Sequence, residues 1–409
     1  MTSSSGDCEV LSFVNAPYLP LLDLWLRQSS DYIGSRPRIL CTDEAAYNEC
    51  RNDPRMIAEN ASDHDWSDRT NFWKSRFSIL HQRLESHIDI LHTDLDAFWL
   101  KSPWPYIEGR EEDFIFSREF GLPKHLVPKW GFVLCCGFFR ANSTPAARSF
   151  FARWHKYVER YGDDQFALNT LLDELDINWE ATAFHNFVAH RGFVKIDGHT
   201  ISFLSLPYAC ISREPPFLSK GEAVAHTFFE KQYFTGFIRL YERLLDRNQH
   251  LDAIILPPSI MTNAPSQMKK RDVATLHMLR EFMRDDDCDA ALWDQRSVLE
   301  ARFGNQEAAL AAILRATMLA PSESRYKIEA TDLLLKAGNT QMAREILETV
   351  GTPTADTHGN TMRLRLRQLR LLLSTGLFGQ LFLKSLDPAY FGEGLKAIPR
   401  ALYIRLLKK

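Results

Sequence analysis

The chain has 409 residues, a formal net charge of −3 and an isoelectric point of about 6.5, which argues against a strongly basic nucleic-acid-binding protein. Hydrophobic residues make up 45% and charged residues 25%, as in a globular protein of one or two domains. No run of about twenty apolar residues is present, so we expect no membrane span. The polar segment 1–7 lacks a signal-peptide pattern and the seven cysteines lack a framework spacing, so we expect a cytoplasmic protein.

The first half of the chain alternates short apolar runs with amphipathic stretches. Pro145 follows Ser143-Thr144, which is a typical helix start, and Asp197-Gly198 is a typical hairpin turn. Because strands alternate with helices, we predict an α/β fold with a largely parallel sheet. The predicted strands lie at 10–14, 38–41, 88–91, 114–116, 132–139 and 223–226, a hairpin at 193–206, and helices at 18–26, 73–84, 145–158 and 163–175.

The second half changes composition near residue 255. Pro257-Pro258 and the segment 263–266 are typical of a linker, and the sequence beyond them is helical throughout. We therefore predict an α/β domain at 8–250, a linker at 251–270 and an all-α domain at 271–409.

This helical region contains an internal repeat. Gly304 and Gly338 are 34 residues apart (338 − 304), and Ala309 and Ala343 have the same spacing (343 − 309). A period of 34 is that of the tetratricopeptide helix pair, which the region resembles, with a weaker third copy around 364–382. A generic helical bundle remains the alternative interpretation.

The segment with the most specific chemistry is Asp94-Leu95-Asp96, directly after an apolar strand. Residues at i and i+2 of an extended chain face the same side, so the two carboxylates repel each other unless a cation lies between them. Hard divalent cations bind carboxylates and share them with substrate phosphates. A solvated turn is the alternative, although the following Phe98-Trp99-Leu100 is apolar for such a turn.

The segment 94–103 resembles the "D-x-D-x-x-W-L-x-x-P" block of the DXD-type nucleotide-diphospho-sugar transferases, specifically glycosyltransferase family 77 and its bacterial relatives. The resemblance spans roughly residues 8 to 240, and its further blocks follow in chain order: 13–18 with Trp25-Leu26, 137–144, 164–169, and His226 with Lys231. It implies a GT-A fold, which is a Rossmann-like mixed sheet between helices. It also implies a UDP- or GDP-sugar donor, Mn²⁺ (or Mg²⁺) as cofactor, and retention of anomeric configuration.

The same resemblance implies roles for individual residues. Asp94, Asp96 and His226 would bind the metal, and Lys231 would bind the diphosphate. Contacts with other parts of the donor are also implied: Asp94 with the ribose or sugar, Asp43 with the base or ribose, Gly137 with the sugar by close backbone approach, and Asp164 and Gln165 with the region of the anomeric carbon.

Each assignment has a structural alternative. Asp163 or Asp164 is also a candidate helix N-cap, and Asp43 a candidate turn residue. His226 fits a core histidine and Lys231 a solvated surface lysine. Arg76 projects away from the apolar face of its helix and would reach the donor phosphates or form a surface ion pair. His92 is placed to orient Asp94.

We therefore expect a metal-dependent retaining glycosyltransferase acting on an unknown protein, peptide or glycan acceptor. The helical region would dock a protein or peptide acceptor. The main alternative is a non-catalytic interaction protein, because Cys135-Cys136 stands where related enzymes often carry Asn and a small residue. A phosphoryl or nucleotidyl transferase is a second alternative, but no phosphate-binding glycine-rich loop is visible.

Overall fold

A computed structural model describes residues 8–218, 221–227, 234–247, 250–251, 269–283 and 289–350. These residues belong to two compact units, Met1–Phe282 and Met283–Lys409, which are described separately below. Lys231, the third repeat copy and nearly all of the predicted linker lie outside the described residues. The predicted domain boundaries therefore remain predictions.

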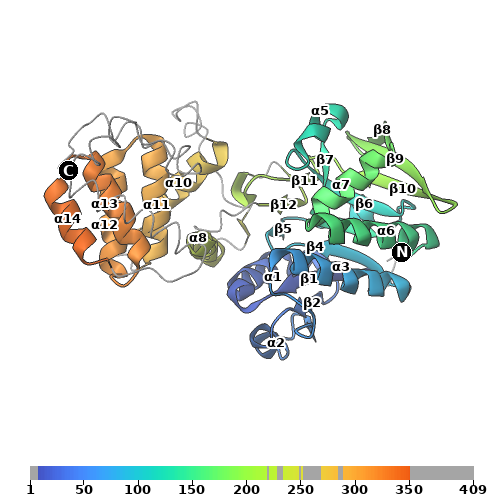
Figure 1. The fold of residues 1–409 in the computed structure, drawn as a ribbon, viewed down its shortest axis with the longest axis horizontal. Coiled ribbons are helices and arrows are strands. Elements are labelled where there is room, and N and C mark those ends of the chain that lie inside the picture. Colours follow the sequence, from blue (N-terminus) through green and yellow to red (C-terminus); the bar gives the residue numbers. More distant parts are fainter. Residues whose placement is uncertain are drawn as a thin grey trace, which may run out of the picture. The chain divides into compact units, whose positions relative to one another are not determined.

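A nine-stranded mixed sheet forms the centre of the first unit (Figure 1). Its order is β3-β2-β1-β4-β7-β6-β10-β9-β8. The strands are β1 (Cys8–Val14), β2 (Arg38–Cys41), β3 (Ile57–Asn60), β4 (Asp89–Thr93), β6 (Phe114–Glu119), β7 (Val133–Ala141), β8 (Asn178–Phe184), β9 (Phe187–Ile196) and β10 (His199–Ser205).

The predicted α/β class is confirmed, but the sheet is less parallel than the alternation of elements indicated. Strands β3, β2, β1 and β4 pair in parallel, as do β6 and β10, whereas β7 runs antiparallel to both β4 and β6. Strands β8, β9 and β10 also pair antiparallel. The β9–β10 reversal is local, because Asp197 and Gly198 both have positive φ, at 51° and 82°, and form the predicted two-residue turn.

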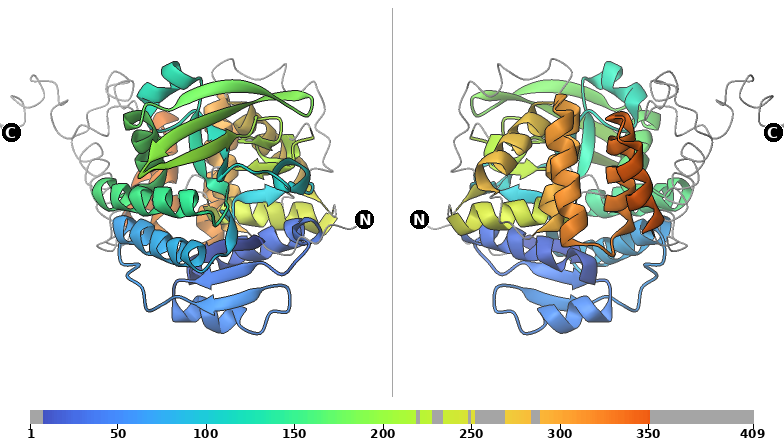
Figure 2. Two further views of the ribbon diagram at one scale, coloured as in Figure 1. Left: turned by 90° about the vertical axis from the view of Figure 1, so that its right-hand side faces the viewer. Right: turned by 90° about the vertical axis from the view of Figure 1, so that its left-hand side faces the viewer.

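Three helices, α3 (Arg69–Glu85), α6 (Pro145–Tyr161) and α7 (Asp164–Glu174), pack together against this sheet. Helices α3 and α6 lie side by side, as both views in Figure 2 show. The Phe77 ring stacks on Phe151 at 4.9 Å and meets Trp154 edge-on at 4.4 Å. This aromatic core fixes the N-terminus of α7 near the end of β4, where the candidate site lies.

A second, three-stranded sheet consists of β5 (Ala97–Trp99), β11 (Ile211–Ser212) and β12 (Val224–His226). Strand β12 pairs antiparallel with β5, so that His226 lies opposite Ala97. Helix α1 (Leu19–Ile33) anchors β5, because Trp25 Nε1 donates to the Ala97 carbonyl at 3.0 Å. This small sheet brings the imidazole of β12 to the acidic turn before β5.

The first unit contains further helices outside the layer formed by α3, α6 and α7. The first unit also contains α2 (Glu44–Cys50), α8 (Phe234–Arg247) and α10 (Lys270–Phe282), besides short turns. Within the described part of the chain, no helix is long and apolar enough to cross a membrane.

The described part of the second unit contains two helix pairs, α11 (Ala290–Phe303) with α12 (Gln306–Leu319) and α13 (Ser324–Lys336) with α14 (Thr340–Glu348). Corresponding helices begin 34 residues apart (324 − 290 and 340 − 306). The loops match as well, because Asn305 N donates to Glu300 O at 2.9 Å and Asn339 N to Leu334 O at 2.8 Å. The 34-residue period is thus present in the backbone, while the tetratricopeptide assignment stays a prediction.

Candidate active site

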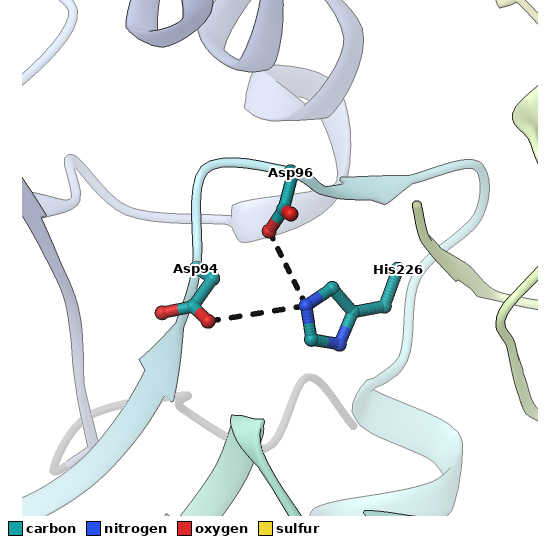
Figure 3. Close-up of side chains that lie close together, drawn as sticks. All are labelled: Asp94, Asp96 and His226. Carbon is teal, nitrogen blue, oxygen red and sulfur yellow. Dashed lines mark ion pairs between the residues drawn. The ribbon is translucent and has the colours of Figure 1, made fainter. Parts of the chain in front are cut away.

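Asp94, Asp96 and His226 converge at the junction of the two sheets (Figure 3). His226 Nε2 lies 3.2 Å from Asp96 Oδ1 and 3.8 Å from Asp94 Oδ2. One ligand atom from each of the three side chains lies within 4.8 Å of the other two. The structure therefore brings together the three residues that were predicted to bind metal.

Backbone hydrogen bonds hold the acidic turn in place. Asp94 N donates to the Gly137 carbonyl at 2.7 Å, and Ala97 N donates to the Asp94 carbonyl at 3.0 Å. Thr227 N donates to the Asp96 carbonyl at 2.8 Å, which ties the turn to the end of β12. The position of both carboxylates is thus set by β4, β7 and β12 together.

The three side chains fit a hard divalent cation. Two carboxylates and one imidazole supply oxygen and nitrogen ligands suited to Mn²⁺, and they leave coordination positions for substrate oxygens. Gly137 on β7 is part of this fit, because an added Cβ there would overlap His226 and lie 2.7 Å from Asp94 Oδ2. In the structure this glycine makes room for two of the ligand side chains.

The charge state of His226 is linked to the carboxylates. Burial and the nearby Arg213 lower the pKa of His226, but the charge and hydrogen bond of Asp96 raise it to about 10. Without metal, the imidazolium therefore pairs with the carboxylates at neutral pH. Since a metal binds neutral imidazole, metal binding must release this proton.

Arg76 connects the acidic turn with the start of α7. Its guanidinium contacts Asp94 Oδ1 at 3.2 Å, pairs with Asp164, and lies 4.5 Å from the Trp73 ring centre. The expected surface ion pair is wrong, since the Arg76 side chain is only 3% exposed. The expected projection away from the apolar face of α3 is also wrong, since the guanidinium packs on Trp73. The cause is the close packing of α3 on α6, which directs this side chain between the two carboxylates.

His92 supports Asp94 from the buried side of β4. Its Nε2 lies 3.0 Å from Asp94 Oδ1, which is the orienting contact that the sequence indicated. Burial and Arg76 lower the pKa of His92 to about 4, so the ring is neutral and donates through Nε2. Although burial would raise the pKa of Asp94, His92 and Arg76 hold it well below its usual range.

The two neighbouring acids at the start of α7 have different roles. Asp163 is the N-cap, and its Oδ1 accepts from Phe166 N at 2.9 Å. Asp164 is buried beside Arg76, and burial raises its pKa to about 6 although Arg76 opposes the shift. Gln165 turns away from Asp164 to donate through Nε2 to the Leu122 carbonyl at 3.1 Å.

The two adjacent cysteines of β7 point in different directions. Cys135 Sγ lies 3.6 Å from His226 Nδ1 and 3.7 Å from Arg213 Nη1, whereas Cys136 belongs to the hydrophobic core. Cys135 thus contacts Nδ1 of His226, while Nε2 of the same ring faces the two carboxylates. Arg213 was missed in the sequence, because no recognisable motif surrounds it.

Asp43 lies at the carboxyl end of β2. Its Oδ1 accepts from Ala46 N at 2.7 Å and caps α2, while Oδ2 accepts from Ala16 N at 2.9 Å. Asp43 was expected as a turn residue and is instead the N-cap of α2, and its donor role remains a prediction. Trp99 is fully buried, as expected of a core residue.

The fold and the site together define a mixed α/β protein with an Asp-Asp-His cluster at the junction of its two sheets. Residues 38–264, more than half of the chain, match the family model of the nucleotide-diphospho-sugar transferases. The chain belongs to this family. The narrower resemblance to glycosyltransferase family 77 remains a prediction.

Two solved structures of the glycosyltransferase GlyE from Streptococcus pneumoniae TIGR4 are similar to the chain. One aligns with a TM-score of 0.33 and 12% identity over 73% of this chain, and the apo form with 0.33 and 11% over 74%. The alignments cover 64% of each GlyE chain. No curated protein matches the chain.

Proposed function

We propose that the chain is a metal-dependent glycosyltransferase that uses a UDP- or GDP-sugar donor and retains the anomeric configuration. The convergence of Asp94, Asp96 and His226, next to the Arg76–Asp164 pair, is the observation that carries the proposal. Membership of the nucleotide-diphospho-sugar transferase family supports it.

The reaction breaks the bond between the anomeric carbon and the diphosphate oxygen, and the electron pair leaves with the diphosphate. The acceptor hydroxyl oxygen forms the new bond to that carbon, and its proton passes to the departing diphosphate. Asp94, Asp96 and His226 would hold a divalent cation, whose positive charge would stabilise this leaving group. Lys231 is proposed as a further diphosphate contact.

Asp164 is the proposed group nearest to the anomeric carbon. Arg76 keeps its carboxylate in place, and above a pH of about 6 Asp164 is ionised. An ionised carboxylate acts either as nucleophile in a double displacement or as stabiliser of an oxocarbenium ion during same-face attack. Gln165 would line the same region, Gly137 the donor sugar, and Asp43 the base or ribose.

A non-catalytic interaction protein is the second candidate, which the Cys135 contact with His226 favours. Cys135-Cys136 stands where related enzymes often carry Asn and a small residue, so a thiol replaces an amide. In either case the C-terminal helices are proposed to dock a protein or peptide.

A donor screen tests the proposal. The purified chain with Mn²⁺ is incubated with a panel of UDP- and GDP-sugars, and the nucleotide products are separated. We expect slow hydrolysis that releases a nucleoside diphosphate and is lost in Asp96→Asn, but kept in Asp63→Asn, whose side chain is 85% exposed. Release of a nucleoside monophosphate with a sugar 1-phosphate would show attack at phosphorus, as in a phosphoryl or nucleotidyl transferase, and no turnover with any donor would favour the interaction protein.

A further inference from the structure

Phe120, on the loop that follows β6, forms an aromatic pair with Tyr208, which lies after β10. The Phe120 ring stacks on Tyr208 with centroids 4.7 Å apart and an interplanar angle of 17°. Phe120 is 61% exposed, and Leu122 on the same loop is 50% exposed. Large apolar side chains rarely gather on the surface of a soluble domain without a binding role.

Both ends of this loop are tied to the candidate active site. At one end, Glu119 Oε1 lies 3.8 Å from Arg213 Nη2, and Arg213 contacts Cys135, which in turn contacts His226. At the other end, the Leu122 carbonyl accepts from Gln165, next to Asp164. The aromatic pair therefore adjoins the groups at which the reaction is proposed to occur.

Tyr208 has a buried hydroxyl group. Its hydroxyl oxygen is buried and has no hydrogen-bond partner among the residues that the structure describes. Because this atom is buried, the hydroxyl points toward the protein interior. What Tyr208 offers at the surface is thus its ring, as a support under Phe120.

The mixture of groups around the pair matches a sugar ring better than a peptide. A pyranose has a face of C–H groups that packs on an aromatic ring, and a rim of hydroxyls that needs donors and acceptors. Arg213 and Glu119 supply these beside the stack and are 24% and 25% exposed. An apolar peptide side chain would have no use for the donors and acceptors of this partly exposed pair.

We propose that the Phe120–Tyr208 pair is the acceptor subsite and that the acceptor is a carbohydrate, whose ring packs on Phe120 while one of its hydroxyls reaches the anomeric carbon. This inference rests on the proposed glycosyl transfer. It commits the acceptor to one chemical class.

The test compares Phe120→Ala, Phe120→Trp and Phe193→Ala, the last removing a 46% exposed phenylalanine on β9. Transfer from the active donor to a panel of mono- and disaccharide glycosides is measured beside donor hydrolysis. We expect Phe120→Ala to raise the KM for the saccharide about tenfold, with a much smaller loss of hydrolysis. Phe120→Trp should restore the KM, and Phe193→Ala should match the wild type.

Saccharide binding without donor keeps this inference separate from the proposed function. Quenching of the new tryptophan in Phe120→Trp, with Phe193→Trp as control, reports binding even if the chain turns over no donor. Quenching in the first variant alone supports the subsite. Saccharide transfer and binding that ignore Phe120, or transfer only to peptides, would overturn the proposal.

Discussion

Arg76 is a buried cation that holds two carboxylates of different function at once. Its partners are Asp94 of the metal cluster and Asp164 at the start of α7. Removing one member of a buried ion pair is costly because the other charge loses its partner. We therefore expect Arg76→Met to lower the free energy of unfolding by about 3–5 kcal/mol, measured by urea denaturation at pH 7.

A second variant separates charge from packing. In the Arg76→Met/Asp164→Asn double variant the Asp164 carboxylate that lost Arg76 is absent, so part of the lost stability should return. If the double variant were as unstable as the sum of the two single variants, the pairing would have little energetic weight.

Asp164 makes stability depend on pH in a defined direction. Its pKa in the folded protein is about 6, above the ordinary value of 3.8, so the folded state holds the proton more tightly. The stabilisation from this group is present below pH 4 and is lost as the pH rises through 6. Relative to wild type, Asp164→Asn should thus gain up to about 3 kcal/mol between pH 4 and 7. Parallel stability curves for the two proteins would contradict this.

Cys135 tests the support of the metal-site imidazole. Outer contacts of a ligating histidine typically change metal affinity by about 10–100-fold. Cys135→Ala should weaken Mn²⁺ binding in this range, measured by calorimetry, and Cys135→Ser should weaken it less because a hydroxyl still accepts from Nδ1. Cys136→Ala is the matched control, since that thiol lies in the core and should alter stability without altering Mn²⁺ affinity.

At the scale of elements, β7 sets how closely the ligands approach one another. Gly137→Ala would place a methyl group on His226 and Asp94, so we expect Mn²⁺ affinity to fall by at least about a hundredfold. Gly192→Ala on β9 also crowds its neighbours, with Ile177 Cδ1 at 2.7 Å, but it lies outside the cluster. It should lower stability and leave Mn²⁺ binding unchanged. Equal Mn²⁺ affinity in both variants would contradict the role of Gly137.

The sequence predicted the helices and strands that are marked by a local pattern of side chains. Apolar runs identified β1, β2, β4, β6 and β7, and Pro145 with Thr144 identified the start of α6. It could not give strand direction, because apolar runs look the same in parallel and antiparallel pairs. It also missed β5, which has only three residues and is held by contacts from α1 and β12.

The same distinction applies to the candidate site. Asp94 and Asp96 were predictable because their spacing along one strand end places them together. The partners of Arg76 were not, since they depend on how α3 packs against α6 and α7. The Arg213–Cys135 contact joins residues 78 apart (213 − 135) and the Phe120–Tyr208 pair residues 88 apart (208 − 120), and no local pattern marks such contacts.

At the scale of the molecule, every described residue of the candidate site belongs to the first unit. A chain ending at Phe282 should therefore keep Mn²⁺ and nucleotide binding, measured by calorimetry, and lose only the docking of a protein or peptide partner. If the truncated protein folded but no longer bound nucleotide, the helical unit would contribute to the donor site.

Asp94, Asp96 and His226 are proposed to hold a cation that in turn binds a diphosphate. The most direct measurement is Mn²⁺ binding followed by electron paramagnetic resonance, with and without UDP or GDP, in wild type, Asp94→Asn and Asp63→Asn. We predict that wild type and Asp63→Asn bind Mn²⁺ more tightly with a nucleoside diphosphate present, and that Asp94→Asn does not. Mn²⁺ binding that is equal in all three proteins, or unaffected by the diphosphate, would contradict the account.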